Sequence, residues 1–93
     1  MTAPQSDEMN DPNIDTVAPS EGSSAGGGEV TIEGSLLADV AKVTFDNIQV
    51  DPTSKTESVV KCISPPHNPG PVDVFVTNSD GTTKSNTLPY RYV

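Results

Sequence analysis

One stretch of the chain, residues 71–84, combines the signals that most constrain a small β fold. Val72, Val74 and Val76 recur at every second position, as in a strand with one buried face. The next four residues, Asn78-Ser79-Asp80-Gly81, have the composition of a type I turn with glycine at its last position. We therefore predict a β-hairpin over this stretch and expect the other strands to pack around it.

The apolar residues of the chain favour strands over helices. Leu, Ile, Val and Phe number 20 of 93 residues, and 11 of the 20 are Val. β-Branched residues pack well on a sheet, and no run with helical spacing stands out. None of the twenty lies in residues 1–13. We predict one all-β domain over residues 14–93, preceded by an acidic, extended and flexible arm over residues 1–13.

Alternation of polar and apolar residues predicts the remaining strands. They are expected at residues 14–19, 29–34, 42–45, 48–50, 57–64 and 85–93, with a tight turn at Asp46-Asn47. Residues 20–28 have the composition of a flexible connection, and residues 35–40 of one helical turn or a bulged loop whose leucines cap the core. Pro89 marks its strand as an edge or a bulge. Nine side chains fall on the inward side of their strands: Val30, Ile32, Val43, Phe45, Val60, Cys62, Val72, Val74 and Val76. Leu88, Tyr90 and Tyr92 also recur at every second position, and we expect at least two of them to cover the open end of this core.

The charge balance excludes one class of partner. The net charge is −8, and the five positive side chains are scattered along the chain. Binding to a phosphate backbone needs a basic stripe, so nucleic acid is not an expected partner. No run approaches the roughly 20 apolar residues that span a bilayer, and the first residues do not form a basic and then apolar leader. Neither membrane insertion nor a secretion signal is therefore predicted.

Few residues offer catalytic or metal chemistry. Cys62 is the only cysteine and falls on an inward face, where it is expected to act as a small apolar residue. His67 is the only base near it in sequence, and no third polar group accompanies the two. One His and one Cys cannot fill a zinc site. Asp46, Asp51 and Asp80 lie near turns but lack the spacing of a calcium loop, so a calcium site there is only the alternative. We predict a non-enzymatic protein without cofactor or metal.

The candidate partner-binding residues lie in the arm and on one outward face. Asp7, Glu8 and Asp11 give the arm three negative charges and no positive one. Such a segment can become ordered when it binds a partner, and the alternative is that it is only a solubilising tail. Ile14 follows the arm at the start of the first strand and is included among the candidates. Phe75 lies on an outward position, where an aromatic is either a single surface residue or the anchor of a docking patch.

Several glycine, proline and valine motifs follow one another in a definite order. They are Pro19-x-x-Gly22, Gly27-Gly28-x-Val30-Thr31-Ile32-x-Gly34, Val43-x-Phe45, Val60-x-Cys62-x-Ser64-Pro65-Pro66, Gly70-x-Val72-Asp73-Val74-x-Val76-x-Asn78-x-Asp80-Gly81 and Tyr90-x-Tyr92. This order resembles the IPT/TIG family of immunoglobulin-like domains over about residues 14–93, with a departure at Ser35-Leu36-Leu37. The resemblance implies a seven-stranded sandwich of two antiparallel sheets. It implies no shared active site.

Two functions fit such a domain. The first is a decoration protein on the capsid of a tailed phage, which would lie on the virion surface with the capsid lattice as its protein partner. One domain, a short acidic arm, no secretion signal and a chain that ends with its domain at Val93 favour this hypothesis. The second is a spacer or accessory binding module of a larger secreted or cell-surface protein, for which carbohydrate is a further candidate ligand. The fold alone does not choose between them.

Overall fold

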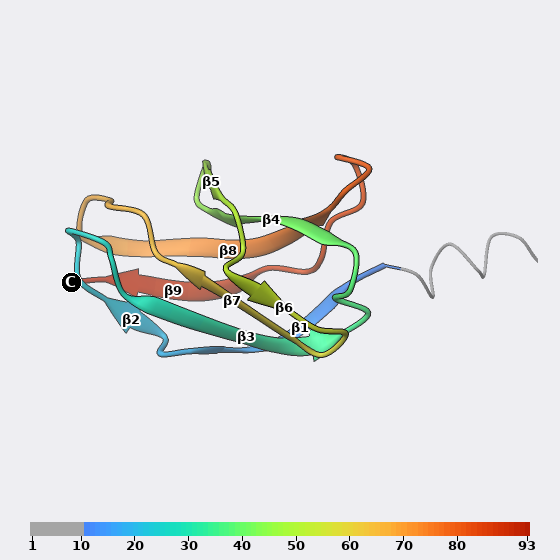
Figure 1. The fold of residues 1–93 in the computed structure, drawn as a ribbon. Coiled ribbons are helices and arrows are strands. Elements are labelled where there is room, and N and C mark those ends of the chain that lie inside the picture. Colours follow the sequence, from blue (N-terminus) through green and yellow to red (C-terminus); the bar gives the residue numbers. More distant parts are fainter. Residues whose placement is uncertain (1–10) are drawn as a thin grey trace, which may run out of the picture.

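In a computed structural model, which describes residues 11–93, the chain forms a sandwich of two β-sheets (Figure 1). The strands are β1 (Asn13–Ala18), β2 (Glu21–Gly22), β3 (Glu29–Ser35), β4 (Val40–Phe45), β5 (Ile48–Val50), β6 (Ser54–Lys55), β7 (Val59–Ile63), β8 (Gly70–Asn78) and β9 (Leu88–Tyr92). The described part holds no helix, and so none that could cross a bilayer. Seven strands have three or more residues, and β2 and β6 have two each. The predicted all-β sandwich is confirmed.

The larger sheet has the strand order β2-β9-β8-β4-β5, and β8 is its longest strand with nine residues. On one side β8 pairs antiparallel with β4, where Val74 lies opposite Phe45. On its other side it pairs antiparallel with β9, where Val72 lies opposite Tyr90. The stretch with valines at residues 72, 74 and 76 is therefore the central strand of this five-stranded sheet.

The turn after β8 forms as predicted, but the short hairpin does not. The backbone N–H of Gly81 donates to Asn78 O over 3.0 Å, and Gly81 has a φ of 78°, which glycine adopts without strain. The Asp80 carboxylate then accepts hydrogen bonds from the next two backbone N–H groups. Beyond the turn an isolated bridge at Lys84, with hydrogen bonds that involve Thr83 and Ser85, joins the returning chain to β8, but residues 82–84 form no strand. The predicted second strand of the hairpin is wrong, because β9 takes that place instead.

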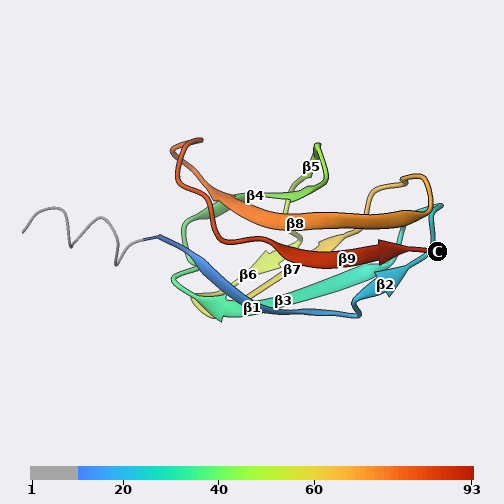
Figure 2. The ribbon, with the colours of Figure 1, turned by 180° about the vertical axis from the view of Figure 1, so that it is seen from behind.

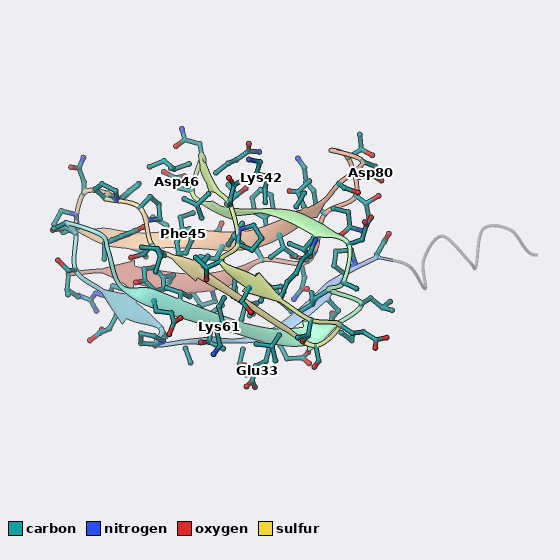
Figure 3. The ribbon with its side chains drawn as sticks, in the orientation of Figure 1. Glu33, Lys42, Phe45, Asp46, Lys61 and Asp80 are labelled. Carbon is teal, nitrogen blue, oxygen red and sulfur yellow. The ribbon has the colours of Figure 1, made fainter. Side chains whose placement is uncertain are left out.

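The smaller sheet has the order β1-β3-β7-β6 and shows the predicted alternation. Between β3 and β7, Val30 lies opposite Cys62 and Ile32 opposite Val60. All four side chains are buried against the other sheet. Glu33, on the alternate side of β3, points away from the sandwich (Figure 3). One face of each strand therefore builds the core and the other meets the solvent.

The chain changes sheets between its first two strands. β1 forms an edge of the four-stranded sheet, as predicted, whereas β2 joins the five-stranded sheet through a short parallel pairing with β9. The peptide bond before Pro19, which lies between them, is cis. Residues 20–28 were expected to be a flexible connection, but they include β2 and are tied to other segments. One such tie is the hydrogen bond from the Gly27 N–H to Ser64 O at 2.9 Å.

The core between the sheets contains all nine predicted side chains, each exposed by 8% or less. It also contains five that the prediction of the inward faces left out: Ile14, Leu37, Val40, Tyr90 and Tyr92. Of the three residues from which at least two were expected to cover the core, Tyr90 and Tyr92 are buried and Leu88 is partly buried against it. The Phe45 ring meets Tyr90 edge-on with centroids 5.3 Å apart, and Tyr90 meets Tyr92 in the same way at 5.2 Å. Such edge-to-face pairs stabilise a core beyond the area they bury.

Residues 36–39, between β3 and β4, form a turn and not a turn of helix. Leu37 is fully buried, and its backbone N–H donates to Glu57 O over 2.8 Å. Leu36 takes the left-handed conformation, with a φ of 59°, and is 38% exposed. Only one of the two leucines therefore caps the core, and the other is turned towards the solvent.

We expect Phe45→Ala to lower the free energy of unfolding by about 3–5 kcal/mol, because it removes a fully buried ring that contacts two tyrosines. Urea denaturation followed by circular dichroism measures this loss. Ile63→Ala is the control at a position that is 42% exposed, and it should cost about 1 kcal/mol or less. An unchanged denaturation midpoint for Phe45→Ala would contradict the central place given to this ring.

Candidate functional site

The described chain enters and leaves the sandwich at opposite ends (Figures 1 and 2). β1 begins beside the turn at residues 35–39 and the loop at residues 79–87, and we call this the arm end. Val93 lies at the other end beside the loop at residues 64–70, and we call this the carboxyl end. The polar side chains that could serve a function form three groups: one at each end and one on the outer face of the five-stranded sheet.

A cavity of about 640 Å³ opens at the arm end. Four carboxylates line it: Asp11, Asp39, Glu57 and Asp80. No basic side chain of the described residues is part of the lining, and Leu36 and Ala38 supply an apolar portion. The structure thus joins Asp11, a predicted partner residue, to three acids that the sequence analysis did not connect with it. The three lie in separate loops, and only the general excess of acids hinted at such a cluster.

The loop geometry holds one of these acids in its charged form. Thr83 donates to the Asp80 carboxylate from both its hydroxyl and its backbone N–H, and Thr82 donates from its backbone N–H. These hydrogen bonds, that of the Thr83 hydroxyl first, lower the pKa of Asp80 to about 2. Asp80 therefore keeps its negative charge throughout the neutral range.

A buried amide also lines this cavity. Asn78 is only 7% exposed, and its Oδ1 has no hydrogen-bond partner among the described residues. A buried polar group left without a partner costs about 1–3 kcal/mol. The sequence identifies Asn78 only as a turn residue. It does not show that its amide oxygen is buried without a partner, because no pattern in a single sequence shows which amides lack a hydrogen bond.

Phe75 lies on the outer face of the five-stranded sheet, where it is half-buried. Thr44 is opposite it on β4, and the Lys84 ammonium lies 5.6 Å from the ring centroid. The hydroxyl groups of Thr44 and Thr77 are buried and have no partner in the described part of the chain. The alternation of residues along the strand predicts that Phe75 points outward. It does not show the two unpaired hydroxyl groups beside the ring.

The other predicted partner residues have different places. Ile14 is 1% exposed, so its side chain belongs to the core and is not available to a partner. Its backbone N–H and C=O both pair with the Asn86 side-chain amide, each over 2.9 Å, and these bonds tie β1 to the loop before β9. Asp7 and Glu8 lie outside the described residues, so their contact with a partner stays a prediction.

Cys62 and His67 do not form a catalytic pair. Burial raises the pKa of the Cys62 thiol to about 12, so it stays protonated, as expected of a small apolar residue. The His67 ring stacks on Tyr92 with centroids 5.0 Å apart. Its Nε2 lies 3.1 Å from Asp46 Oδ2, and its Nδ1 lies 2.8 Å from Asn68 O. His67 therefore closes the carboxyl end of the core.

The three aspartates considered for calcium do not meet. Asp46 pairs with His67, Asp51 pairs with Lys42, and Asp80 is engaged by its own loop. Figure 3 shows Asp46 and Asp80 in separate parts of the molecule. Within residues 11–93, no group of three or more acidic, histidine or cysteine side chains is arranged to hold a metal ion.

We expect the pair formed by His67 and Asp46 to make stability depend on pH. Hydrogen bonds to the Asn68 carbonyl and to Asp46 raise the pKa of His67 above its ordinary value. A raised pKa means that the stabilisation is complete below the unfolded value of about 6.5 and is lost as the pH rises through the folded value. The parent should therefore exceed His67→Gln in melting temperature by more near pH 5.5 than near pH 8.5. These pH values lie about one unit below and two units above the unfolded pKa. An equal difference at both pH values would contradict the pair.

The model of the IPT/TIG domain family matches residues 12–92 of the chain. Among solved structures, the gamma-CGTase of alkalophilic Bacillus clarkii is 28% identical with a TM-score of 0.77, and the match covers 90% of this chain and 12% of that one. No curated protein sequence matches the chain.

Two further solved structures share the fold at lower identity. SGBP-B from a complex xyloglucan utilization locus in Bacteroides uniformis is 22% identical with a TM-score of 0.67, over 88% of this chain and 23% of that one. The full extracellular region of plexin A4 is 17% identical with a TM-score of 0.72, over 88% of this chain and 10% of that one. The chain therefore spans less than a quarter of each of these three relatives.

Proposed function

The chain belongs to the IPT/TIG domain family, an immunoglobulin-like fold without a catalytic centre of its own, and on that premise we propose that it is an interaction module of an extracellular or cell-surface protein. The relatives support this context, since one is an extracellular region and each is several times longer than this chain. The opposite placement of the two ends also suits a module in series. Segments attached at the two ends would be separated by the length of β8, about 30 Å for nine residues.

The observation that carries the proposal is the composition of the outer face around Phe75. An aromatic ring there is half-buried, and two buried threonine hydroxyl groups next to it have no hydrogen-bond partner within the described residues. A partner that covers this face would bury the rest of the ring. Aromatic residues are enriched in protein interfaces, and they contribute most where water is excluded.

A protein surface is the partner that this face fits best. The Lys84 ammonium over the ring is a weak contact, of about 0.5–1 kcal/mol at an exposed site, so a partner could displace it at small cost. Carbohydrate is a second candidate, because a ring flanked by hydroxyl groups also provides the mixture of apolar and polar contacts that small-molecule sites use. The likeness to SGBP-B adds only the fold to that second candidate.

A phage capsid is a narrower candidate for the protein partner. It rests on the acidic arm and the single domain in the sequence, and none of the three solved relatives is described as a virion protein. If the arm binds a capsid lattice, deletion of residues 1–10 should abolish attachment and leave the melting temperature unchanged. Full occupancy by the truncated protein would reject the arm as the attachment segment.

We expect Phe75→Ala to weaken partner binding by about tenfold or more, because it removes the aromatic anchor. The unfolding free energy should fall by only about 1 kcal/mol, since the ring lies on the outer face and is only partly buried. A displayed library of protein fragments selected on the parent chain supplies the binders, and xyloglucan serves as the carbohydrate probe. Biolayer interferometry compares their affinities for the parent and the variant.

Glu33→Ala on the opposite sheet is the matched control for this measurement and should leave the affinity unchanged. Fragments that bind the parent and Phe75→Ala equally well would contradict the proposed face. Saturable binding of xyloglucan that is lost in Phe75→Ala would replace the protein partner with a carbohydrate.

A further inference from the structure

We propose that the cavity at the arm end receives a cationic side chain, an arginine above all, from a protein partner. This inference rests on the proposed function as an interaction module and names the chemistry of the partner. Four carboxylates and no basic group of the described residues line the cavity. The described part contains two ion pairs, Lys42 with Asp51 and His67 with Asp46, and neither involves these four acids. The cavity therefore holds uncompensated negative charge.

Two of the carboxylates have acceptor atoms to spare. Within the described residues, the Glu57 side chain accepts no hydrogen bond, and Asp39 accepts one, from a serine hydroxyl to Oδ1 over 3.0 Å. Asp80 is occupied by its own loop and contributes its charge. Lys55, on β6, donates to Val40 O over 2.6 Å and does not line the cavity. A guest cation would thus find open acceptors on Asp39 and Glu57.

Asn78 indicates a polar guest independently of the charges. Its amide lines the cavity, is 7% exposed and leaves Oδ1 without a donor from the described chain. Rotation of the amide about its last bond lets it present either its oxygen or its NH₂ group to the cavity. A guanidinium has five donors and no acceptor, so it supplies the kind of group that Asn78 and the two carboxylates lack.

The apolar part of the lining favours an amino-acid side chain over a bare metal ion. Leu36, which is 38% exposed, and Ala38 line the cavity beside the acids. The methylene stem of an arginine can pack on such a surface while its head reaches the carboxylates. Calcium needs six to eight oxygen atoms at about 2.3–2.6 Å, and no three acids of the described residues converge in that way.

An NMR titration of the full ¹⁵N-labelled chain tests the proposal. The probe is the peptide acetyl-Gly-Ala-Arg-Ala-Gly-amide, and its control is the same peptide with citrulline, which has a similar shape and no charge. We expect saturable shifts at the amides of residues 36–39, 57 and 78–83 with the arginine peptide. The citrulline peptide should bind at least about tenfold more weakly than the arginine peptide. Added NaCl should lower the affinity of the arginine peptide.

Paired substitutions separate the cavity from the general acidity of the chain. Asp39→Asn with Glu57→Gln should weaken the arginine peptide about tenfold, because two charged acceptors are lost while their shapes remain. Glu29→Gln with Glu33→Gln removes the same charge from the outer face of the four-stranded sheet and should change the affinity less than about twofold. Asn78→Ala should weaken binding about threefold and leave the chain folded, because the side-chain oxygen has no hydrogen-bond partner among residues 11–93.

Four results would overturn the proposal. Equal losses in both pairs of variants would mean general attraction to an acidic chain. Saturation of the same amides by CaCl₂ alone, at concentrations that displace the peptide, would mean a metal site. Shifts that centre on Phe75 and disappear in Phe75→Ala would reject the cavity while leaving the proposed function in place. No response to either peptide would reject the cavity and leave the test of Phe75 unaffected.

Discussion

The packing of one valine-rich face against another supports the rest of this structure. The inner faces of β3 and β7 and of β4 and β8 carry the buried side chains, and Phe45 lies between the layers beside two tyrosines. Because side chains alternate along a strand, this one buried interface also decides which residues point outward. A shift of β8 by one residue would bring Phe75 into the core and put Val74 in water. The position of every surface feature thus depends on that packing.

The two ends of the sandwich are closed in different ways. At the carboxyl end the Tyr92 hydroxyl donates to Pro65 O over 2.7 Å, and His67 stacks on its ring while its nitrogens have partners. At the arm end the amide oxygen of Asn78 has no partner among the residues that the structure describes, and acidic side chains line a cavity. Since unpaired buried groups reduce stability, the first arrangement fits a structural role. The arrangement at the arm end fits the proposed binding surface.

The two proposed contact regions would contribute to recognition through different chemistry. The face around Phe75 offers an aromatic ring and hydroxyl groups, and such contacts determine how long a complex lasts. The acidic cavity offers uncompensated charge, which attracts a basic partner from a distance and speeds association. Both regions are formed by loops and outward positions, so they can vary without disturbing the core.

The sequence by itself determined the all-β class, the inward side of β3, β4, β7 and β8, and the nine central core residues. A period-two pattern of valines is a local signal, and burial on one face follows from it directly. It also placed Phe75 outward and Cys62 inward, and its motifs indicated the family.

Only the tertiary structure decided which distant residues meet. It put Ile14 in the core and brought Asp11 close to Asp39, Glu57 and Asp80. It also paired β8 with β9, after the loop at residues 79–87, and not with the residues that directly follow the turn. It also left the oxygen atoms of Thr44, Thr77 and Asn78 unpaired in the described chain. These features depend on contacts between segments far apart in sequence, and no local pattern of polar and apolar residues encodes them, because hydrogen bonding and charge clustering arise only once the chain has packed.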